Sequence, residues 1–264
     1  MKIVAILLLA ILTFSCSDDD EKGTEENKGQ WAMIFNETVK SDSNPVDRTE
    51  KFMFDGERLI QHIIKQRYFE EEISDEVNLS YSDNQVTVTT DYLTLVYTLN
   101  SEGYASQCVY SLSSQNRIYH FSYSAEGYLT RIVENIDDTE YSSTSLTYEN
   151  GDITSISSKM NGLENKFIYE PGEESSTYHL PCLGLLEIHP LTFHIEALYA
   201  GLLGKDPRHF TIRSCPAGSN DEKTVYSYGF DKKGNPSRMI CQTTYAGGQA
   251  NYYPYTRNIS ISFE

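Results

Sequence analysis

Three short turns that contain glycine recur along the middle of the chain at a constant spacing. They occupy Asn100–Gly103, Ser124–Gly127 and Glu149–Gly151, and their glycines lie 24 residues apart. The tight turn of a two-stranded β-ribbon often requires a residue with positive φ, which glycine adopts without a steric penalty. The Asn and Ser side chains of these turns can bond to the backbone of the turn itself. The spacing therefore predicts a ladder of β-hairpins.

The residues before each turn support this interpretation. Apolar side chains two positions apart precede each glycine turn, and period two places such pairs on one face of a strand. These pairs are Tyr97 and Leu99, Phe121 and Tyr123, and Leu146 and Tyr148. The same pattern recurs before Gly56 and before Gly234. We therefore expect a mainly all-β chain, folded as a large curved antiparallel meander or an open barrel-like sheet.

Polar runs on these strands bear on the surroundings of the sheet. Ser142–Ser145 places four hydroxyl side chains in a row, so both faces of the strand are polar there. The lipid face of a membrane-spanning barrel needs apolar alternation sustained over about ten residues per strand. The pattern therefore argues against a barrel that spans a membrane.

The segment from Pro171 to Cys215 breaks the hairpin pattern. Apolar residues at helical spacing lie within it: Ile195, Leu198, Tyr199, Leu202 and Leu203. Gly204 would suit the C-terminal cap of this helix. We expect a helix of about three to four turns, over about residues 188–204, packed on the concave face of the sheet because its apolar stripe must be buried. The rest of 31–264 reads as one antiparallel β domain.

The N-terminus has the pattern of a bacterial lipoprotein. Residues 1–15 contain Lys2 and an apolar run of 12 residues, Ile3–Phe14, which is shorter than the about 20 residues that cross a bilayer. Ser15 and Cys16 after this run resemble a lipobox, so we expect cleavage before Cys16 and lipidation of its sulfur. An ordinary signal peptide with an incidental cysteine is the alternative. Residues 16–30 predict an acidic disordered tether.

Serine followed by acids directly after Cys16 is similar to the surface-export signal of Bacteroidota lipoproteins. With this start, the ladder along the whole chain and one late helix, the sequence resembles a Bacteroidota family of unknown function described as having a porin-like fold, over roughly residues 31–264. The hairpins, with an aromatic pair, Asp and Gly as in Phe52–Gly56, also resemble the tyrosine-aspartate (YD) repeats of Rhs-type proteins. The resemblance implies a shape and a location at the outer membrane, exposed on the cell surface or facing the periplasm. It implies no catalytic residue.

Four cysteines follow the tether: Cys108, Cys182, Cys215 and Cys241. An even number of cysteines in an exported chain indicates disulfides. We favour a Cys182–Cys215 bridge, which would close the helical insert, and four buried thiols are the alternative.

An aromatic row, Tyr119, Phe121 and Tyr123, lies on one strand face. It can stack on a sugar or line an apolar pocket, or it can pack against side chains of the neighbouring strands.

The charge and the motifs exclude several classes of function. A net charge of −17 disfavours a nucleic-acid partner. No phosphate loop, nucleophile elbow or metal-ligand spacing is present, so we expect no cofactor and no metal.

We therefore predict a membrane-anchored lipoprotein that binds a glycan, lipid or protein without catalysis. A glycan hydrolase with paired carboxylates and a structural or adhesive surface protein are the alternatives. An aromatic-lined cleft without paired acids favours the first function, and carboxylates about 5–10 Å apart in a cleft favour the second. A concave face filled completely by the helix favours the third.

Overall fold

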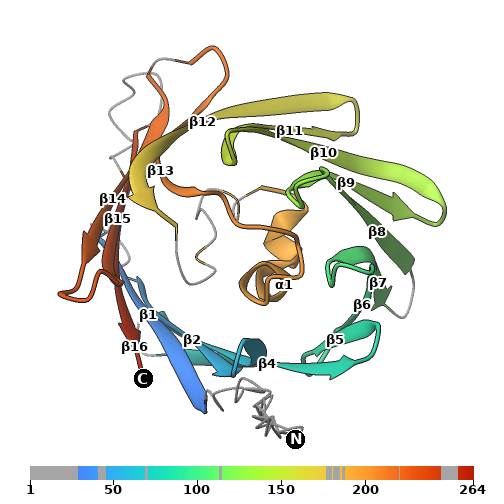
Figure 1. The fold of residues 1–264 in the computed structure, drawn as a ribbon, viewed down its shortest axis with the longest axis horizontal. Coiled ribbons are helices and arrows are strands. Elements are labelled where there is room, and N and C mark those ends of the chain that lie inside the picture. Colours follow the sequence, from blue (N-terminus) through green and yellow to red (C-terminus); the bar gives the residue numbers. More distant parts are fainter. Residues whose placement is uncertain are drawn as a thin grey trace, which may run out of the picture.

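In a computed structural model of the chain, the described residues form sixteen antiparallel strands that close into one barrel (Figure 1). The structure describes residues 29–40, 46–68, 71–112, 115–176, 180, 185, 188–219, 221–244 and 255–264. The strands are β1 (Gln30–Lys40), β2 (Val46–Asp55), β3 (Arg58–Tyr68), β4 (Glu71–Ser82), β5 (Gln85–Thr89), β6 (Thr94–Leu99), β7 (Ala105–Leu112), β8 (Gln115–Tyr123), β9 (Leu129–Ile136), β10 (Thr139–Glu149), β11 (Asp152–Met160), β12 (Leu163–Ser175), β13 (His209–Pro216), β14 (Lys223–Phe230), β15 (Pro236–Thr244) and β16 (Tyr255–Phe263).

The predicted all-β antiparallel meander is confirmed. The sheet is not open but closes on itself as a barrel. Each strand pairs with the next along the chain, and β16 pairs with β1, for example through Phe263 and Met33. Closure pairs every described strand with two neighbours, although β13 and β14 pair only through Arg213 with Val225 and Ser214 with Thr224.

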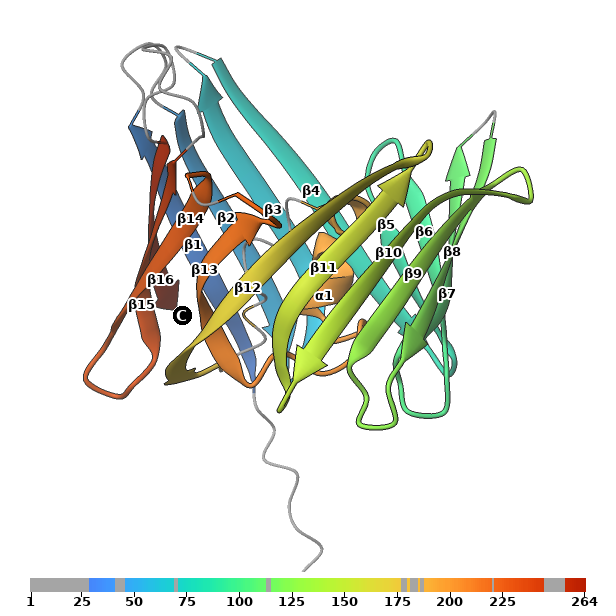
Figure 2. The same ribbon diagram turned by 90° about the horizontal axis from the view of Figure 1, so that it is seen from above.

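The glycine turns have the geometry that the sequence predicted. Gly103, Gly127 and Gly151 have φ values of +85°, +91° and +89°. Because the chain runs up and down, these three turns and those at Gly56 and Gly234 all lie at one end of the barrel, which we call the turn end. Strand β1 also begins at the turn end (Figure 2). The opposite end, the loop end, carries the connections from β11 to β12 and from β13 to β14.

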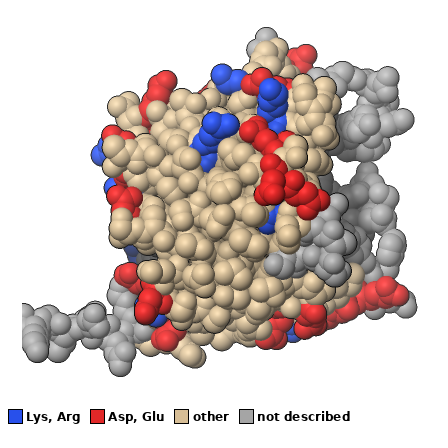
Figure 3. Space-filling model, turned by 90° about the vertical axis from the view of Figure 1, so that its right-hand side faces the viewer, with Lys and Arg blue, Asp and Glu red and all other residues tan. Residues whose placement is uncertain are grey.

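The inner face of the barrel is apolar and the outer face is polar. Inner side chains such as Phe52, Ile132 and Ile156 are fully buried. On the outer face, Gln61 of β3 pairs with Asn78 of β4, and their amide groups lie 3.1 Å apart. Acidic and basic side chains lie among neutral ones on the face seen in Figure 3. This is the reverse of a membrane-spanning barrel, whose outer face is apolar.

Residues 188–208, which precede β13, lie in the interior of the barrel (Figure 1). We call residues 188–208 the plug. It contains a 3₁₀ turn, η2 (Leu191–Phe193), and one short helix, α1 (Ile195–Tyr199). No helix in the described ranges is long and apolar enough to cross a bilayer.

The predicted helix over 188–204 is therefore too long. Gly201, with φ of +69°, ends α1, and the amide of Leu202 bonds back to the carbonyl of Ala197, as in a Schellman motif. The predicted cap, Gly204, lies beyond this end. Leu202 and Leu203 are buried as expected, but in the turns that follow the helix.

Candidate functional site

The plug is hydrogen-bonded to the turn end of the barrel. The amide of Ala105 donates to the carbonyl of Leu202 at 2.7 Å, and the amide of Lys205 donates to the carbonyl of Gly127 at 2.9 Å. The amide of Arg208 donates to the carbonyl of Gly151 at 3.0 Å. Two of the glycine turns thus have a second role, because the carbonyls of Gly127 and Gly151 accept hydrogen bonds from the plug at this end.

A cavity of about 490 Å³, the lumen pocket, lies between the start of the plug and strands β11 to β15. Ile188 and His189 of the plug form one side of it. The pocket reaches the loop end, where Met160, Asn161 and Leu163 line it. Its volume lies in the range of small-molecule sites, which is about 300–1,000 Å³.

The wall of the lumen pocket combines aliphatic, aromatic and uncharged polar side chains. The aromatic members are Phe167, Tyr169 and Tyr226, and the hydroxyl and amide members include Ser158, Asn165, Ser214, Thr224 and Thr243. Glu222 is the single carboxylate among the described lining residues, and Lys223 follows it directly. The carboxylate pair that a glycan hydrolase requires is therefore not assembled from these lining residues.

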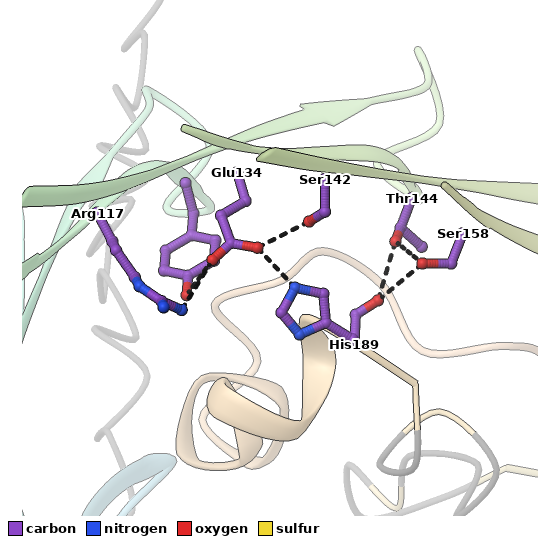
Figure 4. Close-up of polar contacts among 7 residues, drawn as sticks. Arg117, Glu134, Ser142, Thr144, Ser158 and His189 are labelled. Carbon is purple, nitrogen blue, oxygen red and sulfur yellow. Dashed lines mark hydrogen bonds and ion pairs between the residues drawn. The ribbon is translucent and has the colours of Figure 1, made fainter. Parts of the chain in front are cut away.

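A buried carboxylate, Glu134 of β9, lies behind His189 (Figure 4). It accepts hydrogen bonds from Ser142 at 2.7 Å and from Tyr119 at 3.3 Å, and it pairs with Arg117 at 3.1 Å. The Nε2 atom of His189 lies 2.6 Å from the same carboxylate. Burial would raise the pKa of Glu134, but the hydrogen bonds from His189 and Ser142 outweigh it and the pKa is lowered.

The backbone of His189 is also attached to the barrel wall. Its carbonyl accepts hydrogen bonds from Thr144 at 3.0 Å and from Ser158 at 3.2 Å (Figure 4). Because His189 and Ser158 both line the lumen pocket, the Glu134 cluster holds one side of the pocket in place. We read the cluster as a positioning device, since its carboxylate is fully buried.

A second cluster attaches α1 to the opposite wall. His62 of β3 is fully buried between Glu196 of α1, at 2.8 Å, and Glu50 of β2, at 3.2 Å. Arg48 lies 2.6 Å from Glu50. Burial would lower the pKa of His62, but the hydrogen bonds to Glu196 and Glu50 outweigh it and the pKa is raised. The imidazolium form can donate to both carboxylates at once.

The predicted aromatic row packs against the plug. Tyr119 and Phe121 meet the buried ring of His194 edge-on, and Tyr97 lies 2.8 Å from its Nδ1 atom. The hydroxyl of Tyr123 donates to the carbonyl of Ala105 at 2.6 Å. Burial lowers the pKa of His194 to about 3, so this ring is neutral. The row serves as packing, and its use in ligand binding stays a prediction.

The remaining predicted site residues are only partly described. Cys16 and Cys182 lie outside the described residues, so lipidation and the Cys182–Cys215 bridge stay predictions. Of the other cysteines, Cys108 and Cys241 are buried and Cys215 is half-buried. No group of three or more His, Cys, Asp or Glu side chains within the described ranges could hold a metal ion.

The sequence interpretation missed Glu134 and the hydroxyl groups of the lumen pocket. A signal for Glu134 exists, because it lies two positions after Ile132 and so shares the inner face of its strand. A charged residue at a predicted core position usually has a buried partner or a function. The hydroxyl groups have no such signal, since Ser and Thr are ordinary strand residues.

The described fold and pocket can be compared with known proteins. A family model described as a domain of unknown function (DUF4595) with porin-like fold matches residues 47–238, which is more than half of the chain. The chain belongs to this family. No curated protein matches the chain. The resemblance to a porin-like family of unknown function is thus confirmed, whereas no comparison bears on the lipoprotein start or the YD repeats.

Two solved structures share the fold of this DUF4595 chain. A porin-like protein from Bacteroides uniformis ATCC 8492 is 27% identical and superposes with a TM-score of 0.80, covering 88% of this chain and 96% of its own. A porin-like protein from Bacteroides vulgatus ATCC 8482 is 12% identical, with a TM-score of 0.55, covering 87% of this chain and 97% of its own. The second shows the fold alone. In this chain "porin-like" describes the shape of the barrel, since its outer face is polar.

Proposed function

We propose that the protein is an exported lipoprotein of the outer membrane, anchored through Cys16, and that its barrel is a cup for a ligand. The lumen pocket is the observation that carries the proposal. Its wall combines aromatic and uncharged polar side chains and holds one carboxylate among the described lining residues. These features favour binding over hydrolysis.

The placement of β1 and of the lumen pocket at opposite ends of the barrel supports an anchored cup. Strand β1 begins at Gln30 at the turn end, where the plug is hydrogen-bonded, and residues 16–30 before it form the predicted tether. The lumen pocket reaches the opposite, loop end. A protein tethered in this way presents the mouth of its pocket away from the membrane that holds it.

A binding screen with a pocket-filling variant tests the cup. Asn165 lines the lumen pocket and its side chain is exposed, so Asn165→Trp fills the pocket without displacing the core. Ser145→Trp, at an exposed outer position, is the matched control. We expect at least one member of a panel of oligosaccharides and lipids to raise the melting temperature of the mature protein and of Ser145→Trp, but not of Asn165→Trp. A panel without such a member contradicts the proposal.

The anchor is tested separately in cells. Intact-mass spectrometry and labelling with an alkyne fatty acid should find acyl groups on the mature protein, and Cys16→Ala should abolish the label. Protease treatment of whole cells then distinguishes the cell surface from the periplasmic face. A mature protein without acyl groups removes the anchor from the proposal.

A further inference from the structure

The hydroxyl groups of the lumen pocket form a continuous row across three strands. Ser214 of β13 pairs with Thr224 of β14, and Thr224 pairs with Thr243 of β15. Directly opposed residues of neighbouring strands point to the same face with their Cβ atoms about 4.5–5.5 Å apart. The Thr224 and Thr243 hydroxyls lie 3.0 Å from each other. We call these three residues the hydroxyl row.

A second polar pair extends this wall on β11 and β12. Ser158 is opposed to Asn165, and both line the same pocket. The hydroxyl row and this pair together offer donors and acceptors that carry no charge. A ligand in the lumen pocket therefore meets hydrogen-bonding groups on two sides.

Aromatic side chains lie next to these polar groups on the same inner face. Tyr226 is two positions beyond Thr224, and Phe167 is two positions beyond Asn165, so each continues the inner face of its strand toward the turn end. Both line the lumen pocket. A ligand that enters from the loop end passes the polar groups and reaches aromatic rings.

The composition of the wall discriminates between classes of ligand. An aliphatic chain would displace water from the amide groups of Asn161 and Asn165 without replacing its hydrogen bonds, at a cost of up to about 1–3 kcal/mol for each group. The hydroxyl groups bond to protein partners, as Thr224 does to Thr243, and an aliphatic chain would leave their remaining hydrogen-bonding capacity unused. A charged ligand finds Glu222 and Lys223 side by side, so the rim has no surplus of either sign. A neutral sugar offers hydroxyl groups for the polar wall and the C–H face of its ring for the aromatic side chains.

We propose that the lumen pocket binds a neutral saccharide, with the sugar hydroxyls on the hydroxyl row and a ring face against Phe167 or Tyr226. This inference rests on the proposed function, because it names the ligand class of the same cup.

Isothermal titration of the mature protein tests the ligand class. The neutral probes are maltotriose, cellotriose and N-acetylchitotriose, the acidic probe is trigalacturonate, and the aliphatic probe is palmitate. The double variant Thr224→Val and Thr243→Val removes both hydroxyls and keeps the shape of the wall, so no buried partner is left unpaired. Thr147→Val, on the exposed outer face of β10, is the matched control.

We expect a neutral probe to bind, and the double variant to bind it roughly tenfold more weakly, because two hydrogen bonds are lost. The Thr147→Val variant should bind as the parent protein does. If the double variant does not fold by circular dichroism, Asn165→Ala provides the same test from the other side of the pocket.

The negative outcomes separate the two proposals. If palmitate or trigalacturonate binds and the neutral probes do not, and Asn165→Trp abolishes this binding, the saccharide proposal is overturned and the proposal of a ligand-binding cup stands. A neutral saccharide that binds equally well to the double variant and to Asn165→Trp overturns the placement in the lumen pocket. If the protein binds none of the five probes, the saccharide proposal is overturned. The panel of oligosaccharides and lipids then decides whether the barrel binds a ligand at all.

Discussion

The buried imidazole of His62, on the barrel wall, lies 2.8 Å from the carboxylate of Glu196 on α1. The two residues are 134 positions apart in the chain, so their contact joins the plug to the wall by a long-range interaction. Glu50 meets the other ring nitrogen of His62 at 3.2 Å. Removal of the imidazole would leave two carboxylates in the interior with one cation fewer between them.

We expect His62→Phe to lower the free energy of unfolding by about 3–5 kcal/mol, as is usual when one partner of a buried ion pair is removed. The phenyl ring keeps the stacking on Phe52, whose ring centroid lies 4.0 Å from that of His62, so the loss reports on the charge. Urea unfolding followed by fluorescence measures it. His120→Phe, at an exposed outer position of β8, is the control and should change stability by less than about 0.5 kcal/mol.

The same contact predicts a loss of stability as the pH rises above 6.5. The pKa of His62 is raised in the folded protein, so the folded state holds this proton more tightly than the unfolded state does. The resulting stabilisation is complete below the unfolded pKa of 6.5 and is lost as the pH rises through the folded value. Urea unfolding across this range should show the decline in the parent protein, and a decline of equal size in His62→Phe would contradict the assignment.

His194 predicts the opposite effect on the acid side. Burial lowers its pKa to about 3 from 6.5. Between pH 3 and pH 6.5 the unfolded state therefore binds a proton that the folded state does not bind. Its contribution is complete above pH 6.5 and is lost as the pH falls toward 3, by up to about 1.4 kcal/mol per pH unit. We expect His194→Gln to have a shallower dependence of unfolding free energy on pH in this window. Unchanged slopes in the two proteins would refute the role of His194.

The carboxylates add to the loss of stability in acid. The pKa values of Glu50 and Glu134 are lowered, so their stabilisation is complete above the unfolded value of 4.5 and is lost as the pH falls further. The slope that His194 contributes is therefore best measured above pH 4.5, where both carboxylates are still ionised in the folded and most unfolded chains.

The hairpins could be predicted because their determinants are local. A turn with positive φ needs glycine at Gly103 or Gly127, and the apolar alternation on either side can be read directly from the sequence. Strand β13 and the end of β12 were missed because they flank the plug and lack a glycine turn between them. Closure of the barrel depends on the pairing of β1 with β16, and no local pattern reports it.

The candidate site depends on register, which explains why little of it could be predicted. Thr224 and Thr243 each look like ordinary strand residues, and only the pairing of β14 with β15 places their hydroxyls together. Likewise, Glu134 gathers its partners from β8, β10 and the plug. The helix was predicted too long because Leu202 and Leu203 continue the apolar stripe, although it is the packing of the barrel interior that buries them.

The attachment of the plug to the turn end predicts a strong effect at Gly204. This residue has φ of +91°, and a Cβ atom added to it would lie 2.6 Å from the carbonyl oxygen of Gly127. Gly103 is a matched control, because its φ is +85° and an added Cβ atom would meet nothing within 4 Å. Both substitutions to alanine incur the strain of positive φ, which is about 1–2 kcal/mol, but only Gly204→Ala also creates a clash.

We expect Gly204→Ala to lower the free energy of unfolding by about 1–3 kcal/mol more than Gly103→Ala does, since overpacking typically costs this amount. Urea unfolding of the two variants gives the difference directly. Hydrogen exchange at the amide of Lys205, which donates to the same Gly127 carbonyl, should accelerate in Gly204→Ala and stay unchanged in Gly103→Ala. Equal losses of stability with an unaltered Lys205 amide would mean that the glycine turns do not hold the plug.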